Sequence, residues 1–539
     1  MDAFKIIDSV IRRHLKDLRK PNVISVRPGF KFTGGWITNK LAIVVIVDGK
    51  TDKLPAKSLV PSKIERFATD VREVTTMEKL RHKNPQLHAS LMEVGRPEFR
   101  QPVFPFKRDV KTGKLLEEAE PHPSIKAQMQ KPEIPYTTPQ GFNLNPVEDR
   151  FSLICHASPD AGWPTLSEFL KTVKNKLTIG MYDFTSDHIL KAFLSDLGEP
   201  KTSSLSLVLD HPALNHAADQ SDEQTQQKLK ANLGQREDFA WALERNDPRI
   251  SEWIFRSAYH IKVAVRDEDT IWLSSGNFNN SNQPDIDPIK DPSGSSATAK
   301  KSDRDWHVIV THQGLAKTFE AYLLNDLAIA KKYQTETSTA KLNALPTAVT
   351  GKNPEKMKAP GIAPKQYFAP MVIQNEQMKI QPLLTPDTGA GNYVDNVLKL
   401  INSAERSLYM QTQYIHVPTN QGIDRPLWTV INAVKEKMHA GKDVRIIMSE
   451  YEATKSYLEL LQSVGWDMTA IRIQQGVHNK GIVVDSKIVA LGSQNWSGDG
   501  VIRNRDASLI IEHEGAAQYY EKIFLHDWVN MARQHVSGK

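Results

Sequence analysis

Two copies of one residue pattern constrain this chain more than any other feature of its sequence. Residues 260–267 and 478–485 both read H-x-K-x4-D. In each copy an Asn follows the His at the same spacing of 17 positions, at residues 277 and 495. Two ordinary core strands would show no such matched spacing. The repetition therefore predicts one active site that is assembled from two halves of the chain.

Both motifs lie in apolar, β-branched segments followed by turn residues, which is typical of β-strands. In a strand, residues two positions apart share a face, so the His and Lys of each motif project together, and the Asp faces the other way. The residues expected to meet a ligand are His260, Lys262, His478 and Lys480. The residues expected to brace the scaffold are Asp267 and Asp485.

The repetition continues beyond the motifs. An Arg-Asp pair enters an apolar run in each half, at residues 304–305 and 505–506, and a Gly nine positions after each Asp opens a helical pattern. Upstream, a Pro-Asp step leads to a helical pattern and then to a strand, expected at 177–182 in the first half and at 407–411 in the second. The whole unit occurs twice in parallel order.

These residues resemble the signature of the phospholipase D superfamily, H-x-K-x4-D followed by G-S-x-N. The resemblance covers about residues 150–535, and the first copy departs from it with Ser274 at a position where the family prefers Gly. It implies two α/β/α lobes, each with a mostly parallel sheet covered by helices, related by a pseudo-twofold axis with the site between them. The alternating strand and helix patterns favour this α/β fold independently.

Two His and two Lys suit chemistry at a phosphodiester. Positive charge from the Lys side chains and hydrogen bonds from the Asn side chains would stabilise the transition state. One imidazole attacks phosphorus and becomes a phosphohistidine, while the other protonates the leaving alkoxide and then deprotonates water. Imidazole suits both tasks because its unperturbed pKa is near neutrality. By resemblance, the nucleophile is His260 and the acid/base is His478.

In this family an acidic residue downstream of each Asn holds the tautomer of a His. Asp305 and Asp506 match that position, 45 and 28 positions after their His. The predicted catalytic set is His260, Lys262, Asn277, Asp305, His478, Lys480, Asn495 and Asp506. The predicted structural motif residues are Asp267, Asp485, Ser275 and Ser493. Neither a metal nor another cofactor is expected. The extra polar residues between Gln283 and Asp303 are expected beside the site mouth, either as a gate or as a plain surface insertion.

At 539 residues the chain exceeds one typical core. A small α+β domain is expected before the repeat, and its sequence shows no motif for chemistry, so partner binding or regulation is the expected role. The expected division is an N-terminal domain at 1–85, a Pro-rich linker at 86–149, the first lobe at 150–333, a linker at 334–366 and the second lobe at 367–539.

Location and assembly follow by default. With one cysteine, Cys155, the chain forms no intrachain disulfide. The N-terminus lacks the apolar stretch of a signal peptide, and no run approaches the roughly 18 apolar residues of a membrane span. We expect a cytoplasmic enzyme, active as a monomer, with peripheral membrane contact.

The fold and motif indicate phosphodiester chemistry and leave the substrate open. Phospholipase D-type hydrolysis of phospholipid headgroup esters is favoured by the double motif in one chain and by Trp496 beside the second Asn. The alternative is a metal-independent nuclease that cleaves DNA or RNA, favoured by the net charge of +6 and by Lys300-Lys301. An inactive binding scaffold is disfavoured, because both copies retain the full motif.

Overall fold

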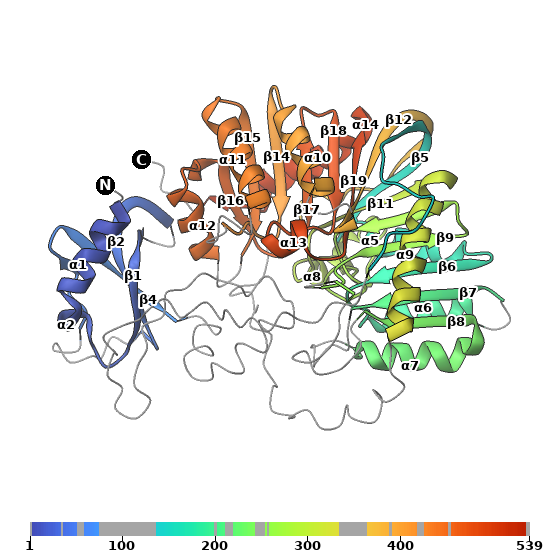
Figure 1. Ribbon diagram of the computed structural model, residues 1–539, viewed down its shortest axis with the longest axis horizontal. Helices are drawn as coiled ribbons and strands as arrows, with labels where there is room; N and C mark the ends of the chain where they lie inside the picture. Colours follow the sequence, from blue (N-terminus) through green and yellow to red (C-terminus); the bar gives the residue numbers. More distant parts are fainter. Residues whose placement is uncertain are drawn as a thin grey trace. The chain divides into compact units, whose positions relative to one another are not determined.

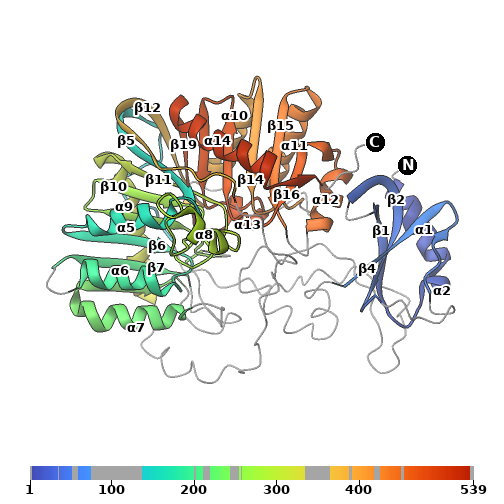
Figure 2. The same ribbon diagram turned by 180° about the vertical axis from the view of Figure 1, so that it is seen from behind.

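A computed structural model describes most of the chain, in two compact units (Figures 1 and 2). The described residues are 3–33, 36–50, 59–74, 136–198, 202–210, 219–242, 254–255, 258–333, 364–387, 391–417, 425–450 and 454–534. The two predicted linkers lie mostly outside these ranges. The smaller unit combines the N-terminal region with residues 452–469, and the larger unit contains both copies of the repeat.

The smaller unit is an α+β structure around a four-stranded sheet of order β1-β2-β4-β3. Ile7, Val10 and Ile11 recur at helical spacing and share a core with Ile43 and Val45, which alternate along a strand. Its elements are α1 (Ala3–Arg13), α2 (Leu15–Leu18), β1 (Val23–Thr33), β2 (Trp36–Val47), β3 (Lys63–Ile64), β4 (Phe67–Glu73) and α12 (Thr454–Ser463).

The helix α12 comes from the sequence of the second repeat. Its buried Glu459 accepts hydrogen bonds from the backbone N–H of Phe30 at 3.3 Å and from Arg72 at 2.6 Å, and it pairs with Arg27 at 2.8 Å. The smaller unit is therefore not built from the first 85 residues alone, although the predicted domain boundaries themselves remain predictions.

The larger unit contains one continuous sheet with two equivalent halves. Its strands run β20-β16-β15-β14-β17-β18-β19-β12-β5-β11-β10-β9-β6-β7-β8, and the antiparallel pair β5 and β12 lies at the centre. The first half contains β5 (Val147–Ser158), α5 (Gly162–Lys171), β6 (Lys176–Met181), α6 (Asp187–Leu197), β7 (Ser204–Leu209), α7 (Asp222–Leu233), β8 (Glu237–Trp241), β9 (Lys262–Arg266), β10 (Thr270–Ser274), α8 (Pro292–Ala299), β11 (Asp305–Thr311) and α9 (Gln313–Tyr333). The second contains β12 (Met371–Thr385), α10 (Gly391–Asn402), β14 (Ser407–Thr412), α11 (Arg425–His439), β15 (Asp443–Ser449), β16 (Ile471–Gln474), β17 (Lys480–Val484), β18 (Ile488–Gly492), α13 (Gly498–Ile502), β19 (Asp506–Glu512), α14 (Glu514–Asn530) and β20 (Arg533–Gln534).

The prediction of mostly parallel sheets is wrong. In the first half, β6-β7 and β7-β8 are parallel, but β5-β11, β11-β10, β10-β9 and β9-β6 are antiparallel. For the pair β9-β10 the reason lies in the motif itself, because a tight turn with positive φ at Asp267 (51°) and Glu268 (60°) joins the two strands. Only antiparallel strands can be joined by so short a connection.

Helices cover both faces of the sheet, which gives the predicted α/β/α lobes (Figures 1 and 2). On one face, Phe319 of α9 and Phe524 of α14 share a core that runs through both halves. On the other face of the first half, Leu166, Phe193 and Leu229 of α5, α6 and α7 pack together. The prediction of two pseudo-symmetric lobes after a small α+β region is confirmed.

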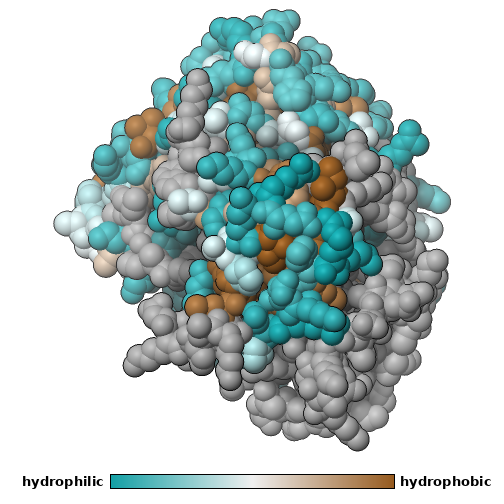
Figure 3. All heavy atoms as spheres, turned by 90° about the vertical axis from the view of Figure 1, so that its left-hand side faces the viewer, coloured by the Kyte–Doolittle hydropathy of each residue, from teal (hydrophilic) through white to brown (hydrophobic). Residues whose placement is uncertain are grey.

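The chain is polar on average, with a mean hydropathy of −0.45. In the view of Figure 3, hydrophilic side chains cover much of the described surface, and hydrophobic atoms show between them. Among the helices that the structure describes, none combines the length and the apolar character needed to cross a membrane.

Two buried arginines join the lobes. Arg304, just before β11, donates Nε to Asp527 of α14 in the second lobe at 2.8 Å. Arg505, just before β19, donates Nη2 to Asp326 of α9 in the first lobe at 2.7 Å. Burial raises the pKa of the Asp527 carboxyl, but the Arg304 charge and the hydrogen bonds from His526, Arg304 and Gln411 together outweigh burial, and the pKa falls to about 2. Each lobe thus supplies the counter-charge for an arginine of the other.

Removing one partner of such a buried pair leaves an uncompensated charge. We expect Asp527→Ala to lower the free energy of unfolding by about 3–5 kcal/mol, measured by chemical denaturation. The matched control is Glu512→Ala, which breaks a half-exposed pair with Lys379 on the same lobe and should cost less than about 1 kcal/mol. Equal losses in the two variants would contradict a buried clamp.

Candidate active site

The His and Lys of each motif lie side by side, as their alternation in a strand predicts. His260 lies two positions before Lys262, which begins β9, and the Lys262 ammonium donates to the His260 carbonyl at 2.6 Å. In the second lobe, Lys480 begins β17, and its Nζ lies 3.1 Å from Nδ1 of His478. Both lysines are buried, so their charges are poorly screened by water.

A backbone bridge brings the two motifs together. Tyr259, which precedes the first His, forms a parallel bridge with Arg505, and Val477, which precedes the second His, forms one with Arg304. The amide of His478 donates to the carbonyl of Arg304 at 3.1 Å. Because an Asp follows each Arg, the bridge delivers the Asp of one lobe to the His of the other.

The His–Asp pairs are consequently exchanged between the lobes. Nδ1 of His260 lies 2.8 Å from Oδ1 of Asp506, and Nδ1 of His478 lies 3.1 Å from Oδ1 of Asp305. Each Asp serves the opposite half rather than the His that precedes it in its own half. Sequence spacing does not reveal this exchange, which depends on the bridge.

The motif serines identify the proton positions. Ser493 accepts the N–H of Ala507 at 3.0 Å and donates its hydroxyl to Oδ1 of Asp506 at 2.5 Å. The same Oδ1 faces His260, so this oxygen is an acceptor and Nδ1 carries the ring proton. Nε2 of His260 then has a lone pair. In the other pair, Ser275 donates to Oδ1 of Asp305 at 2.6 Å.

The Asp that closes each motif lies away from these groups. Asp267 accepts the backbone N–H groups of Lys174, Asn175 and Lys176 at 3.0, 2.7 and 3.0 Å. Asp485 does the same for residues 405–407 at 2.8, 2.8 and 2.7 Å. These bonds attach the motif hairpin to the start of the neighbouring strand.

The two motif asparagines carry unsatisfied groups. Asn277 and Asn495 are 6% and 1% exposed, so water contributes little to their hydrogen bonding. Within the described residues, Oδ1 of Asn277 and both side-chain polar atoms of Asn495 have no hydrogen-bond partner. Buried amides are normally satisfied, so these groups indicate a polar ligand.

The departure at Ser274 has a steric explanation. Its hydroxyl lies 2.6 Å from Nδ1 of His307 on the neighbouring strand, which places this His in a structural role. At the equivalent position of the second lobe, Gly492 faces Ser508, and a Cβ on Gly492 would lie 1.9 Å from its hydroxyl oxygen. The two halves therefore fill the same space in different ways.

Burial and like charges lower the basicity of the cluster. Burial, followed by the charges of Lys262 and Lys480, lowers the pKa of His260 well below its ordinary value. Burial lowers the pKa of Lys262 to about 7, although the nearby Asp506 carboxylate acts to raise it. Burial also raises the pKa of Asp506 to about 7. For Asp305, the charge and hydrogen bond of His478 together with the charges of Lys480 and His307 outweigh burial and lower the pKa to about 2. The two halves are thus electrostatically unequal.

Sequence reasoning missed one aromatic contact. The ring of Tyr182 meets that of His260 edge-on, with centroids 4.9 Å apart, and Nζ of Lys262 lies 5.1 Å from the Tyr182 centroid. The available signal was an aromatic residue at the end of the predicted strand 177–182. That strand, β6, pairs directly with β9.

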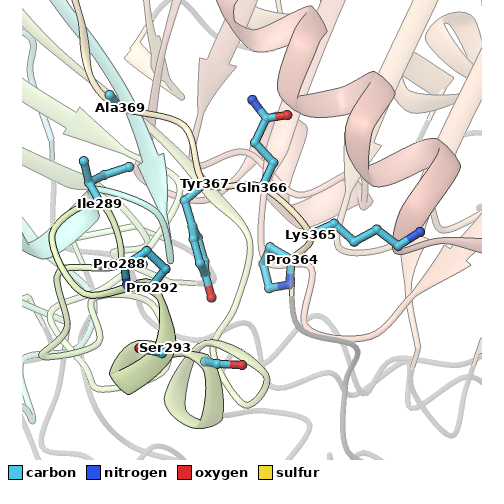
Figure 4. A pocket seen from close by; sticks show the side chains of 10 residues that line it. Pro288, Ile289, Pro292, Ser293, Pro364, Lys365, Gln366, Tyr367 and Ala369 are labelled. Carbon is cyan, nitrogen blue, oxygen red and sulfur yellow. The ribbon is translucent and has the colours of Figure 1, made fainter.

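The polar insertion of the first half contains the helix α8, capped at its N-terminus by Asp291. With the chain that enters the second lobe, it lines a pocket of about 670 Å³ (Figure 4). Figure 4 shows the Tyr367 ring between Pro288 and Pro364, with its hydroxyl directed toward Ser293. The pocket residues are Pro288, Ile289, Pro292, Ser293, Ser296, Pro364, Lys365, Gln366, Tyr367 and Ala369.

The described part of the chain holds no group of three or more His, Cys, Asp and Glu side chains placed to bind a metal ion. The cluster instead combines two imidazoles, two ammonium groups and two carboxylates around buried amides. Such a set can hold a phosphate ester and exchange protons with it.

Known proteins resemble this chain in sequence and in fold. Residues 397–528 match the family model described as cardiolipin synthase, PLD-like domain. A phospholipase D of Rickettsia conorii is 26% identical over 36% of this chain and 93% of its own length. A cardiolipin synthase of Listeria welshimeri is 26% identical over 26% of this chain and 29% of its own length. Among solved structures, the phosphatidylserine synthase of Haemophilus influenzae aligns with a TM-score of 0.46 and 15% identity, over 70% of this chain and 87% of that one.

The fold, the site and these relatives together identify the protein as a two-lobed enzyme of the phosphodiesterase type. The matched family model and the named relatives support its assignment to the phospholipase D superfamily.

The depressed pKa of His260 has a consequence for pH dependence. If the neutral imidazole attacks phosphorus, a lowered pKa keeps that form populated in more acid solution. Turnover should therefore persist as pH falls through 6.5, the ordinary value for His, and be lost only below it. The measurement is the pH profile of kcat/KM on a phosphodiester. An acid limb at or above 6.5 would contradict this environment for His260.

Proposed function

We propose that the protein hydrolyses phospholipid headgroup esters through a phosphohistidine intermediate. The observation that carries the proposal is the crossed arrangement, in which each His has a Lys from its own lobe and a carboxylate from the other. Each imidazole is oriented through Nδ1, which directs Nε2 to a substrate. The His, Lys and Asp side chains of the predicted set lie together in one cluster, which suits them for shared chemistry at one phosphorus.

In the first step, Nε2 of His260 attacks phosphorus while the bond to the leaving oxygen breaks, and His478 gives that oxygen a proton. In the second step, His478 takes a proton from water, the hydroxide oxygen bonds to phosphorus, and the bond to His260 breaks. Lys262 and Lys480 offset the charge on the equatorial oxygens throughout.

The division between the two histidines is supported by their exposure. The His478 side chain is 14% exposed, against 6% for His260. The acid/base must reach a departing alcohol and an incoming water, so the more exposed ring suits that role. The deeper His260, held at 2.8 Å by Asp506, suits in-line attack.

The phospholipid substrate is supported by the pocket beside the insertion. Its wall includes several prolines and Ile289, which is 40% exposed, so an acyl chain would find apolar contacts there. Phe368, next to Tyr367, donates its N–H to Asp160 at 2.9 Å, and Asp160 pairs with Arg304 beside the site. The names of the matched relatives, phospholipase D and cardiolipin synthase, agree with this substrate class.

A nuclease is the second candidate. The net charge of +6 favours a polyanion, and Lys300 and Lys301 lie exposed at the end of α8. Cytoplasmic location, action as a monomer, peripheral membrane contact and partner binding by the N-terminal region also remain proposals. Fractionation of cells, sizing of the active protein, vesicle sedimentation and pull-down with the intact chain test them in turn.

The substrate is decided by parallel assays of the purified protein in EDTA. One arm contains phosphatidylcholine vesicles and the other contains single- and double-stranded nucleic acid. We expect released choline and intact nucleic acid, because the positive charge comes from side chains. Shortened nucleic acid without choline release would favour the nuclease. Turnover that disappears in EDTA and returns with a divalent ion would overturn the two-histidine mechanism.

The covalent step can be trapped. Substitution of either His by Ala should lower turnover at least about 10³-fold, since nucleophilic and acid/base groups contribute on that scale. His478→Asn, given a diester with a nitrophenolate leaving group, should accumulate phosphorus on His260, because no group then activates water. The adduct should be labile in acid and stable in base, as phosphoramidates are. Label on residue 478 of a His260→Asn protein would reverse the two roles.

A further inference from the structure

The two histidines face different residues at one position of the repeat. Arg304 and Arg505 are equivalent, since each forms a bridge with the residue before the opposite His. The residue before Arg304 is Asp303, whereas the residue before Arg505 is Asn504. On one side of the site a carboxylate thus occupies the position that an amide occupies on the other.

Asp303 is held beside His478. Its carboxylate accepts a hydrogen bond from Nδ2 of Asn282 at 3.1 Å, and the same amide donates to Asp305 at 2.9 Å. A Cβ built on Gly476 would lie 3.5 Å from Oδ1 of Asp303, and Gly476 is two positions before His478. One Asn therefore links the carboxylate that bonds to His478 with a second carboxylate nearby.

Charges of both signs surround His478. Asp305 bonds to the ring, Asp303 adds a second negative charge, and Lys480 opposes both. Burial, followed by the Lys480 charge, leaves the pKa of His478 below its ordinary value, although the two carboxylates act to raise it.

The surroundings of His260 are more cationic. The groups that face it are Asp506, Asp210, Lys262, Lys480 and His478. The Asp210 carboxylate already accepts the N–H of Tyr259 at 2.6 Å. Burial and the neighbouring positive charges therefore lower the pKa of His260 well below its ordinary value.

We propose that Asp303 is a positioning residue that assigns the two histidines to different steps. Its carboxylate increases the share of His478 in the protonated form that the leaving alkoxide requires, whereas Asn504 adds no such charge beside the neutral nucleophile His260. No bond to Asp303 forms or breaks. The proton passes from His478 to the leaving oxygen and is recovered from water. The inference rests on the proposed phosphodiester hydrolysis and deepens it.

The test compares wild type and Asp303→Asn on two diesters. Dihexanoylphosphatidylcholine loses an alkoxide that needs a proton, whereas bis(4-nitrophenyl) phosphate loses a phenolate that departs without one. For the lipid, kcat/KM above neutral pH should fall about tenfold, the effect of one pKa unit on His478, while the aryl diester changes less than about twofold. The basic limb of the lipid profile should move to lower pH, because the imidazolium is lost sooner as pH rises.

Two further variants make the comparison specific. Asp238→Asn makes the same chemical change in an exposed pair with Lys331 and should alter neither rate. Asn504→Asp places a carboxylate beside His260 and should slow both diesters, since both need the neutral nucleophile. If Asp303→Asn slows both diesters equally or neither, the inference is wrong and the proposed function stands. If wild type turns over neither diester, the proposed function fails and the inference fails with it.

Discussion

The bridge between the Arg-Asp segment of one lobe and the residue before the His of the other determines the geometry of the site. Arg304 pairs with Val477 and Arg505 with Tyr259, so each lobe completes the histidine of its neighbour. The guanidinium groups are buried at 2% and 0% exposure, and carboxylates from both lobes neutralise them. Neither lobe alone can satisfy its arginine or orient its histidine. A shift of one lobe would therefore break an ion pair and a His–Asp pair at once.

On this symmetric scaffold, several differences between the halves gather around the site. In the first lobe Ser274 faces His307, and at the equivalent positions of the second lobe Gly492 faces Ser508. Both residues of the pair therefore differ between the lobes, while the pairing of the strands is the same. Asp303 comes at the end of the insertion that only the first half carries, and the insertion begins at the loop containing Asn282. An insertion expected to act at the site mouth thus also sets the position of a carboxylate beside one histidine. Pseudo-symmetric binding and asymmetric proton transfer can coexist in this way.

The motif strands, their hairpins and the pairing of each His with its Lys could be predicted because matched spacing leaves few interpretations. Alternation in a strand was enough to place each His beside its Lys and to direct Asp267 and Asp485 elsewhere. The crossed pairs of Asp305 and Asp506 could not be predicted, since they depend on a bridge between distant segments. The antiparallel pair that each motif strand forms with the next strand follows from the tight turn after the motif, a clue present in the sequence. The helix α12 lies hundreds of residues from the strands that its Glu459 contacts, and no local pattern records that partnership.

The electrostatics of the cluster explain why such a site favours the binding of an anion. Burial lowers the pKa of Lys262 to about 7, and the Lys480 charge acts in the same direction, so full protonation of the cluster is unfavourable without a counter-charge. A phosphodiester bound among Lys262, Lys480 and the unsatisfied amides of Asn277 and Asn495 would supply that charge. In the transition state the phosphoryl oxygens become more negative, so the same groups interact with it more strongly than with the ground state. The unfavourable free energy of burying these charges is thus offset most fully when the transition state is bound. Stronger binding of the transition state than of the substrate is what catalysis requires.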